Sequence, residues 1–130
     1  MLLAHYDHTY VVQGELSPRW AATSDPVDRD VCGYPHHVAD SEFRTVGDIF
    51  SPATNPDRKK PFDIRTLMHA VADQDHQVLE RWTGMAGGET SVIFDAHLGG
   101  WPVSLIGIEA RPQPRPGLPT SDGPDTWTAR

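Results

Sequence analysis

Residues 90–111 read TSVIFDAHLGGWPVSLIGIEAR, and this stretch decides the fold. From Thr90 the apolar side chains recur at every second position, which is the period of a β-strand. Gly99 and Gly100 then supply two residues that tolerate a positive φ, and a second apolar run extends from Val103 to Ala110. The pattern predicts a β-hairpin over residues 90–110.

The second strand of this hairpin carries apolar side chains on both faces. Val103 and Leu105 point one way, and Ile106 and Ile108 point the other. Both faces therefore need to be covered, and an isolated hairpin is only marginally stable in water. The helices that the sequence predicts are too short to cover both.

Two short helices are expected before the hairpin. Over residues 63–73 the apolar positions follow the i, i+3, i+4, i+7 and i+8 spacing of an amphipathic helix, with Asp63 as the N-cap. A second helix is predicted over residues 75–83, where it would bury Val78, Leu79 and Trp82. Either Gly84 or Gly87-Gly88 just beyond would end it.

The remaining segments are irregular. Residues 1–12 carry a helical stripe of apolar side chains that begins abruptly, as in the end of a longer helix. Residues 13–61 contain six prolines and little periodicity, apart from one or two helical turns at residues 45–50, and they are expected to form a connector. Residues 112–130 are predicted to be a proline-rich loop.

The composition and charge of the chain argue against several classes of protein. The chain has 130 residues and a formal charge of −7, which argues against nucleic acid as a partner. Only 38% of the residues are hydrophobic, with 12 prolines and 11 glycines, so the sequence predicts a loop-rich chain or a segment of something larger. A single cysteine, no signal peptide and no long apolar run predict a cytoplasmic protein without a membrane span.

Few residues have the spacing of a catalytic or metal site. No metal site is expected, because the seven histidines, including His5 with His8 and His36 with His37, match no known ligand spacing. Cys32 is more simply a passive thiol than a nucleophile. Glu109 and Arg111 are the candidate substrate-binding residues, because they share one face at a strand end; a structural salt bridge between them is the simpler alternative.

Three phrases of the chain resemble a known family. They are DPVDR at residues 25–29, PFDIRTLM at residues 61–68 and LGGWPVSLIGIEAR at residues 98–111. In this order they resemble the carboxyltransferase region of multidomain biotin-dependent acetyl-CoA carboxylases. The similarity extends over nearly the whole chain, and the hairpin phrase is the most specific of the three.

The resemblance implies an α+β or α/β fragment of a crotonase-like fold, a β-β-α superhelix, that spans the seam between its two halves. Residues 1–12 would form the last helix of the first half, residues 13–61 the connector, and residues 62–130 the start of the second half. The implied reaction moves a carboxyl group from carboxybiotin to acetyl-CoA, giving malonyl-CoA. The implied partners are an acyl-CoA, a biotin carrier and the remaining carboxyltransferase segments in a dimer.

None of the family's principal catalytic residues maps onto a position of this chain, so the chain alone is expected to bind no biotin and to be inactive. Two alternatives stay open. The chain could be a non-catalytic module that docks onto an intact carboxyltransferase through residues 63–73 and 90–110. It could also be an unrelated small α+β protein that uses Cys32 or its histidines.

Overall fold

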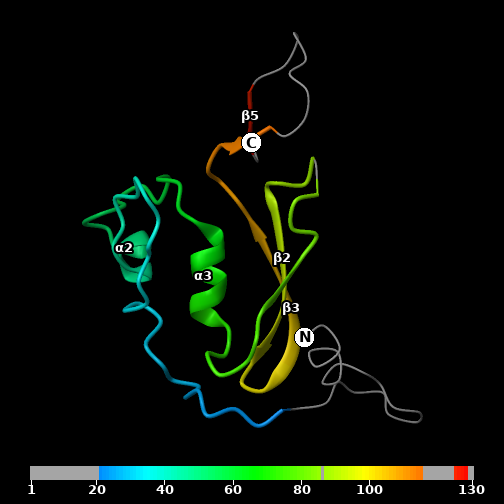
Figure 1. Cartoon of the computed structure of the whole chain (residues 1–130). Helices are drawn as coiled ribbons and strands as arrows, with labels where there is room; N and C mark the ends of the chain where they lie inside the picture. The colour runs from blue at the N-terminus through cyan, green and yellow to red at the C-terminus, as the bar shows by residue number, and fades with distance from the viewer. Residues whose placement is uncertain (1–20, 86, 116–124, 129–130) are drawn as a thin grey trace.

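A computed structural model of the chain describes residues 21–85, 87–115 and 125–128, and it shows a small α+β fold (Figure 1). Two helices, α2 (Val46–Phe50) and α3 (Ile64–Val71), lie on one side of an antiparallel sheet. The helix predicted over residues 1–12 lies outside the described ranges. The α+β class is confirmed, whereas the crotonase-like superhelix stays a prediction.

The sheet contains the predicted hairpin. Its strands are β1 (Leu79–Arg81), β2 (Ser91–Leu98) and β3 (Trp101–Ile108), in the order β1-β2-β3. Strands β2 and β3 pair in antiparallel register over their full length, so that Val92 lies opposite Gly107. The alternating pattern and the Gly99-Gly100 turn thus define the hairpin at the residues that the sequence indicated.

The β2–β3 turn is fixed by a carboxylate from outside the hairpin. Gly99 and Gly100 both have positive φ, +58° and +83°, as a two-residue type I′ turn requires. Their amides donate to the two carboxylate oxygens of Asp73, each at 2.7 Å. Asp73 is buried and follows α3 directly, so this contact joins the end of the helix to the tip of the hairpin.

The prediction of a helix over residues 75–83 is wrong, because residues 79–81 form strand β1. Leu79 lies opposite Asp95 and Arg81 opposite Ile93, so β1 hydrogen-bonds along the edge of β2. Trp82 has φ +55°, which ends any regular element there. Three apolar positions over nine residues fit a short helix or an edge strand equally well, and the unpaired edge of β2 selects the strand.

Helix α3 covers one face of the hairpin at very short range. Asp63 is its N-cap, as predicted, and the helix places Met68 against Val92 and Phe94 in the buried core. Gly107 lies opposite Val92 and has no side chain, so the helix occupies the space that a side chain would fill. A Cβ atom at Gly107 would lie 2.5 Å from Met68 Sδ and 2.6 Å from Ile64 Cγ1. Only glycine permits this approach.

Part of the segment expected to be a connector is folded and contains buried side chains. Within residues 21–61, the predicted short helix is confirmed as α2. Asp48 Oδ2 accepts the amides of Arg44 and Thr45 at 2.9 and 3.0 Å, which satisfies donors at the start of α2. Phe43, Val46, Ile49 and Asn55 are buried. Helix α2 also lies against α3, so this part of the segment is joined to the rest of the described fold.

The proline-rich segment contains a short pairing that the sequence did not predict. Strands β4 (Gln113–Pro114) and β5 (Thr126–Trp127) form a two-stranded antiparallel ladder. The amide of Arg115 donates to the Asp125 carbonyl at 2.9 Å next to it. Two residues from each strand satisfy few backbone groups, so this ladder contributes little to the stability of the fold.

The sheet face opposite α3 remains partly open. Side chains alternate along β3, so Ile106 and Ile108 point away from Gly107 and the helix. Ile106 is 72% exposed and Ile108 is 57% exposed. The expectation that the hairpin lacks sufficient cover holds for this face. Among the described residues, no helix has the length and apolar character needed to cross a bilayer.

The packing of α3 on Gly107 predicts the effect of adding one methyl group. Gly107→Ala places a Cβ inside the contact distance of Met68 and Ile64, so these side chains must shift. Overpacking of this kind costs about 1–3 kcal/mol, more than the roughly 0.4–1 kcal/mol that alanine gains by restricting the unfolded chain. We expect a lower urea midpoint for the full-length variant, monitored by circular dichroism.

The matched control is Gly33→Ala, the same chemical change at an open position. A Cβ there would lie 3.7 Å from Asp30 Oδ2, which is ordinary van der Waals contact. Its urea midpoint should stay close to that of the wild type. Equal midpoints for the two variants would contradict the packing described for α3.

The contact of Asp73 with the turn gives a second stability prediction. Asp73→Ala removes both acceptors and leaves the Gly100 amide buried without them. A hydrogen bond to a charged group contributes about 1.5–3 kcal/mol, so we expect a loss of at least about 2 kcal/mol in urea unfolding. Asp28→Ala, at an exposed carboxylate, is the control. A loss no larger than that of the control would contradict this role for Asp73.

Candidate functional site

Three charged side chains meet at the N-terminus of α3. Asp63 Oδ2 accepts the Thr66 amide at 2.9 Å and the Thr66 hydroxyl at 2.6 Å, which caps the helix. Its other oxygen, Oδ1, forms an ion pair with Arg111 Nη2. Asp63 therefore joins the start of α3 to the residues that follow β3.

The two predicted substrate-binding residues lie together at this point. Glu109 is fully buried, and its Oε1 accepts the amide of Arg111 at 2.8 Å. Its Oε2 pairs with Arg111 Nη2 at 2.9 Å. The same Nη2 reaches Asp63, so one guanidinium bridges two carboxylates. The salt bridge weighed as the simpler alternative is present; substrate contact by these residues stays a prediction.

The ionisation of this network follows from its geometry. Hydrogen bonding to Glu109 raises the pKa of the Arg111 guanidinium. Burial acts to raise the pKa of Asp63, but the Thr66 hydroxyl and amide and the Arg111 charge outweigh it, so the pKa lies below its usual value. Asp63 and Arg111 are therefore both charged at neutral pH.

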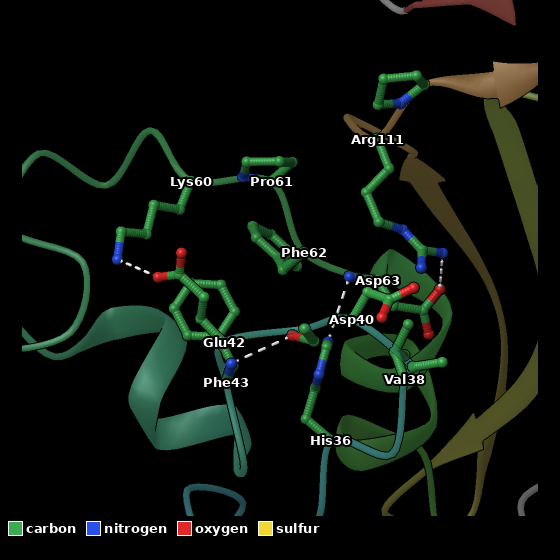
Figure 2. Close-up of a pocket in the computed structure, with 13 residues that line it drawn as sticks. His36, Val38, Asp40, Glu42, Phe43, Lys60, Pro61, Phe62, Asp63 and Arg111 are labelled. Carbon is green, nitrogen blue, oxygen red and sulfur yellow. Dashed lines mark hydrogen bonds and ion pairs between the residues drawn. The ribbon is translucent and has the colours of Figure 1, made fainter.

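A cavity of about 320 Å³ lies beside this network (Figure 2). Its walls come from the segment before α2 and from the residues that lead into α3. They combine charged groups, among them Arg111 and the Lys60–Glu42 ion pair, with aromatic and proline side chains. The cavity is larger than a water site and falls at the small end of ligand pockets.

His36 lies in the wall of this cavity, and no motif in the sequence singled it out. It is only 4% exposed, whereas the adjacent His37 is exposed. The amide of Asp63 donates to His36 Nε2 at 3.3 Å. The ring also meets Phe43 edge-on, with centroids 6.1 Å apart. This segment has little helical or strand periodicity, so the sequence could not predict which of His36 and His37 is buried.

The C-terminal end of α3 is held by residues 25–29. Arg29 Nη2 donates to the carbonyls of Ala70 and Ala72 at 2.9 and 3.2 Å, where a helix end leaves acceptors without partners. Asp25 pairs with Arg29 Nε at 2.8 Å and accepts the Gln74 amide at 3.1 Å. A cation at this position also suits the helix dipole.

One cluster has ligand atoms close enough for a metal ion. Asp73, Asp75 and His76 each offer one atom within 4.8 Å of the others. The carboxylates already accept protein donors, Asp73 from the turn glycines and Asp75 from Thr23 and Ser24. Bonding by the Ser24 amide and the Thr23 hydroxyl lowers the pKa of Asp75. These hydrogen bonds within the protein explain why the three residues lie together.

The other candidates from the sequence show no catalytic arrangement. Cys32 is exposed, and its carbonyl accepts the Gly47 amide at 2.9 Å. In the described ranges, no recorded contact joins this thiol to a histidine. The amides of the Gly99-Gly100 turn do bind an anion, but that anion is the carboxylate of Asp73. His5 and His8 lie outside the described residues.

Comparison of the chain with family models, curated proteins and solved structures found no match.

The pKa of Asp63 predicts how stability depends on pH. Asp63→Asn keeps an N-cap acceptor but loses the negative charge that faces Arg111. Because the folded pKa lies below the unfolded value of 3.8, the charge stabilises the fold above that value, and its contribution disappears as the pH falls through the folded pKa. We expect the urea midpoints of wild type and variant to differ most near neutral pH and to approach each other below about pH 4.

Urea unfolding of both proteins at several pH values checks this expectation. At neutral pH the variant should be less stable by about 1–3 kcal/mol, since it leaves a partly buried guanidinium with one carboxylate fewer. A gap between the two midpoints that stays constant from neutral pH to about pH 2 would contradict it.

Proposed function

We propose that this chain is a segment of the carboxyltransferase part of a biotin-dependent acyl-CoA carboxylase. In the parent enzyme, carboxybiotin on a carrier and an acyl-CoA such as acetyl-CoA would be the substrates. The support comes from the three phrases that resemble this family. They are separate in the sequence, yet all three meet at a single helix, α3.

The middle phrase, residues 61–68, contains the first turns of α3. The first phrase reaches the other end of the helix, where Arg29 binds the carbonyls of Ala70 and Ala72. The last phrase contributes Gly107 beneath the helix and Arg111 beside Asp63. If the three phrases resembled the family by chance, nothing would require them to contact one helix. Segments inherited from one fold would be expected to contact each other in this way.

The open surfaces of the chain also support a segment of a larger body. Strand β3 lies at the edge of the described sheet, and Ile106 and Ile108 on it are exposed. A groove of about 450 Å³ beside β3 is lined almost entirely by apolar side chains, including Phe50 and Val71. We propose that the remaining carboxyltransferase segments cover this edge and groove in the parent enzyme.

The proposed reaction places limits on what this chain contributes. Carboxyl transfer to the α-carbon of an acyl-CoA develops enolate charge on the thioester oxygen, and preorganised N–H donors stabilise it. By the resemblance those donors belong to other segments, so the chain alone would be inactive. Glu109 and Arg111 would line the substrate side of the seam, with Arg111 held in place by Glu109 and Asp63.

Complementation tests this proposal. The full chain is combined with an acetyl-CoA carboxylase carboxyltransferase from which the corresponding seam segment has been deleted, and malonyl-CoA formation is measured. We expect the chain to restore activity, and neither component to be active alone. The Gly33→Ala chain should restore it as well, whereas Gly107→Ala should restore less, because it disturbs the packing of α3.

The outcomes separate the proposal from its main alternative. Tight association with the carboxyltransferase, deleted or intact, without restored malonyl-CoA formation would favour a non-catalytic docking module, for which the exposed edge of β3 is the specific observation. Neither association nor restored activity would overturn both readings.

A further inference from the structure

Strand β3 presents an unpaired backbone edge. In the described sheet it pairs with β2 alone. Directly across this ladder, the amide of Glu109 donates to the Thr90 carbonyl at 2.8 Å. Backbone groups of an antiparallel pair alternate in direction along each strand, so every second residue before Glu109 also faces β2. The residues whose amides and carbonyls face outwards are Ser104, Ile106 and Ile108.

This edge has little of the protection that other edge strands carry. Proteins keep such edges from pairing with charged side chains, bulges or prolines. The eight residues of β3 include no charged residue, and their register with β2 continues without a bulge. The proline of this strand, Pro102, lies beside the turn and leaves residues 103–108 unprotected. The opposite edge strand, β1, carries Glu80 and Arg81 among its three residues.

Apolar side chains flank the edge on both faces of the sheet. On the face away from α3, Ile106 and Ile108 are both more than half exposed. On the face of α3, the groove beside β3 includes the exposed side chains of Phe50 and Val71. A strand added to this edge would contact both sets, so it needs apolar side chains on both of its own faces.

Strand β3 itself meets these requirements. The chain has a formal charge of −7, so two copies repel each other wherever charged surfaces meet. Of the three strands in this sheet, only β3 lacks charged residues. It is apolar on both faces, with Val103 and Leu105 on one and Ile106 and Ile108 on the other. A second copy of β3 therefore brings no charge to the edge and covers apolar side chains on both sides.

We propose that two copies of this chain pair through β3 in an antiparallel register centred on Ile106. Ile106 of one copy then lies opposite Ile106 of the other, and Ser104 lies opposite Ile108. All three residues face outwards, so each of these pairs exchanges two hydrogen bonds. Pro102, which has no amide hydrogen, falls outside them. The two-fold axis is perpendicular to the sheet, so the two α3 helices lie on the same face and the apolar grooves meet.

This inference goes beyond the carboxyltransferase proposal, because it depends on β3 alone. In the parent enzyme the other segments would cover the same edge, so the pairing applies to the chain by itself. The contact involves one short strand and its flanking side chains, which places it among the small and weak interfaces.

Sedimentation equilibrium of the full chain, from about 10 µM to about 1 mM, tests the association. We expect a monomer–dimer equilibrium with a Kd of about 10–100 µM. Amide hydrogen exchange followed by NMR over the same concentrations tests the site. The amides of Ser104, Ile106 and Ile108 should become protected as the dimer forms. Those of Val103 and Leu105 are the internal control, since they already face β2 and should change little.

Two lysine variants form a matched pair. Ile106→Lys places like charges opposite each other at the centre of the pairing, and it should weaken association at least about tenfold. Met85→Lys introduces the same charge at an exposed apolar side chain outside the sheet, and it should leave the Kd unchanged. Both side chains are more than half exposed, so both variants should keep the urea midpoint of the wild type.

Three results would overturn the proposal. A chain that stays monomeric up to about 1 mM would show that β3 does not pair with a second copy. A dimer in which the three outward-facing amides stay unprotected would have its interface elsewhere. Equal weakening by Met85→Lys and Ile106→Lys would mean the same. None of these results changes the complementation outcome, so failure of this pairing and failure of the proposed function are distinguishable.

Discussion

Helix α3 lies directly on strand β3, with Met68 and Ile64 in the space that a side chain at position 107 would fill. This close approach determines where both ends of the helix lie. Its first residues come next to the chain that leaves β3, and its last residues come next to the turn between β2 and β3. Because the buried core is small, these positions are then held by polar contacts rather than by further apolar layers.

The polar contacts at the two ends of α3 are of different kinds. At the C-terminal end, Arg29 binds carbonyls that the helix itself leaves without partners, and the buried carboxylate of Asp73 accepts the amides of Gly99 and Gly100. At the N-terminal end, Glu109 is fully buried, which is costly unless its oxygens are satisfied. Arg111 satisfies both of them through its amide and its guanidinium. That guanidinium is therefore fixed in orientation.

The proposed function draws on the surroundings of this one helix. The carboxyltransferase proposal depends on which segments surround α3, and on the edge of β3 and the apolar groove that remain open. It concerns the surface on which a larger body would assemble.

The sequence by itself determined the hairpin, α3 and α2, because strand alternation, helical spacing, an Asp N-cap and a Gly-Gly turn are all local signals. It also indicated that Glu109 and Arg111 would meet, since they are two residues apart on one face. Residues 79–81 could not be decided locally, because pairing with β2 overrides a weak helical spacing. Only the tertiary structure brought Asp63 to Arg111 across 48 positions and to His36 across 27. Such contacts depend on how closely α3 approaches the sheet, and no periodicity along the chain encodes that distance.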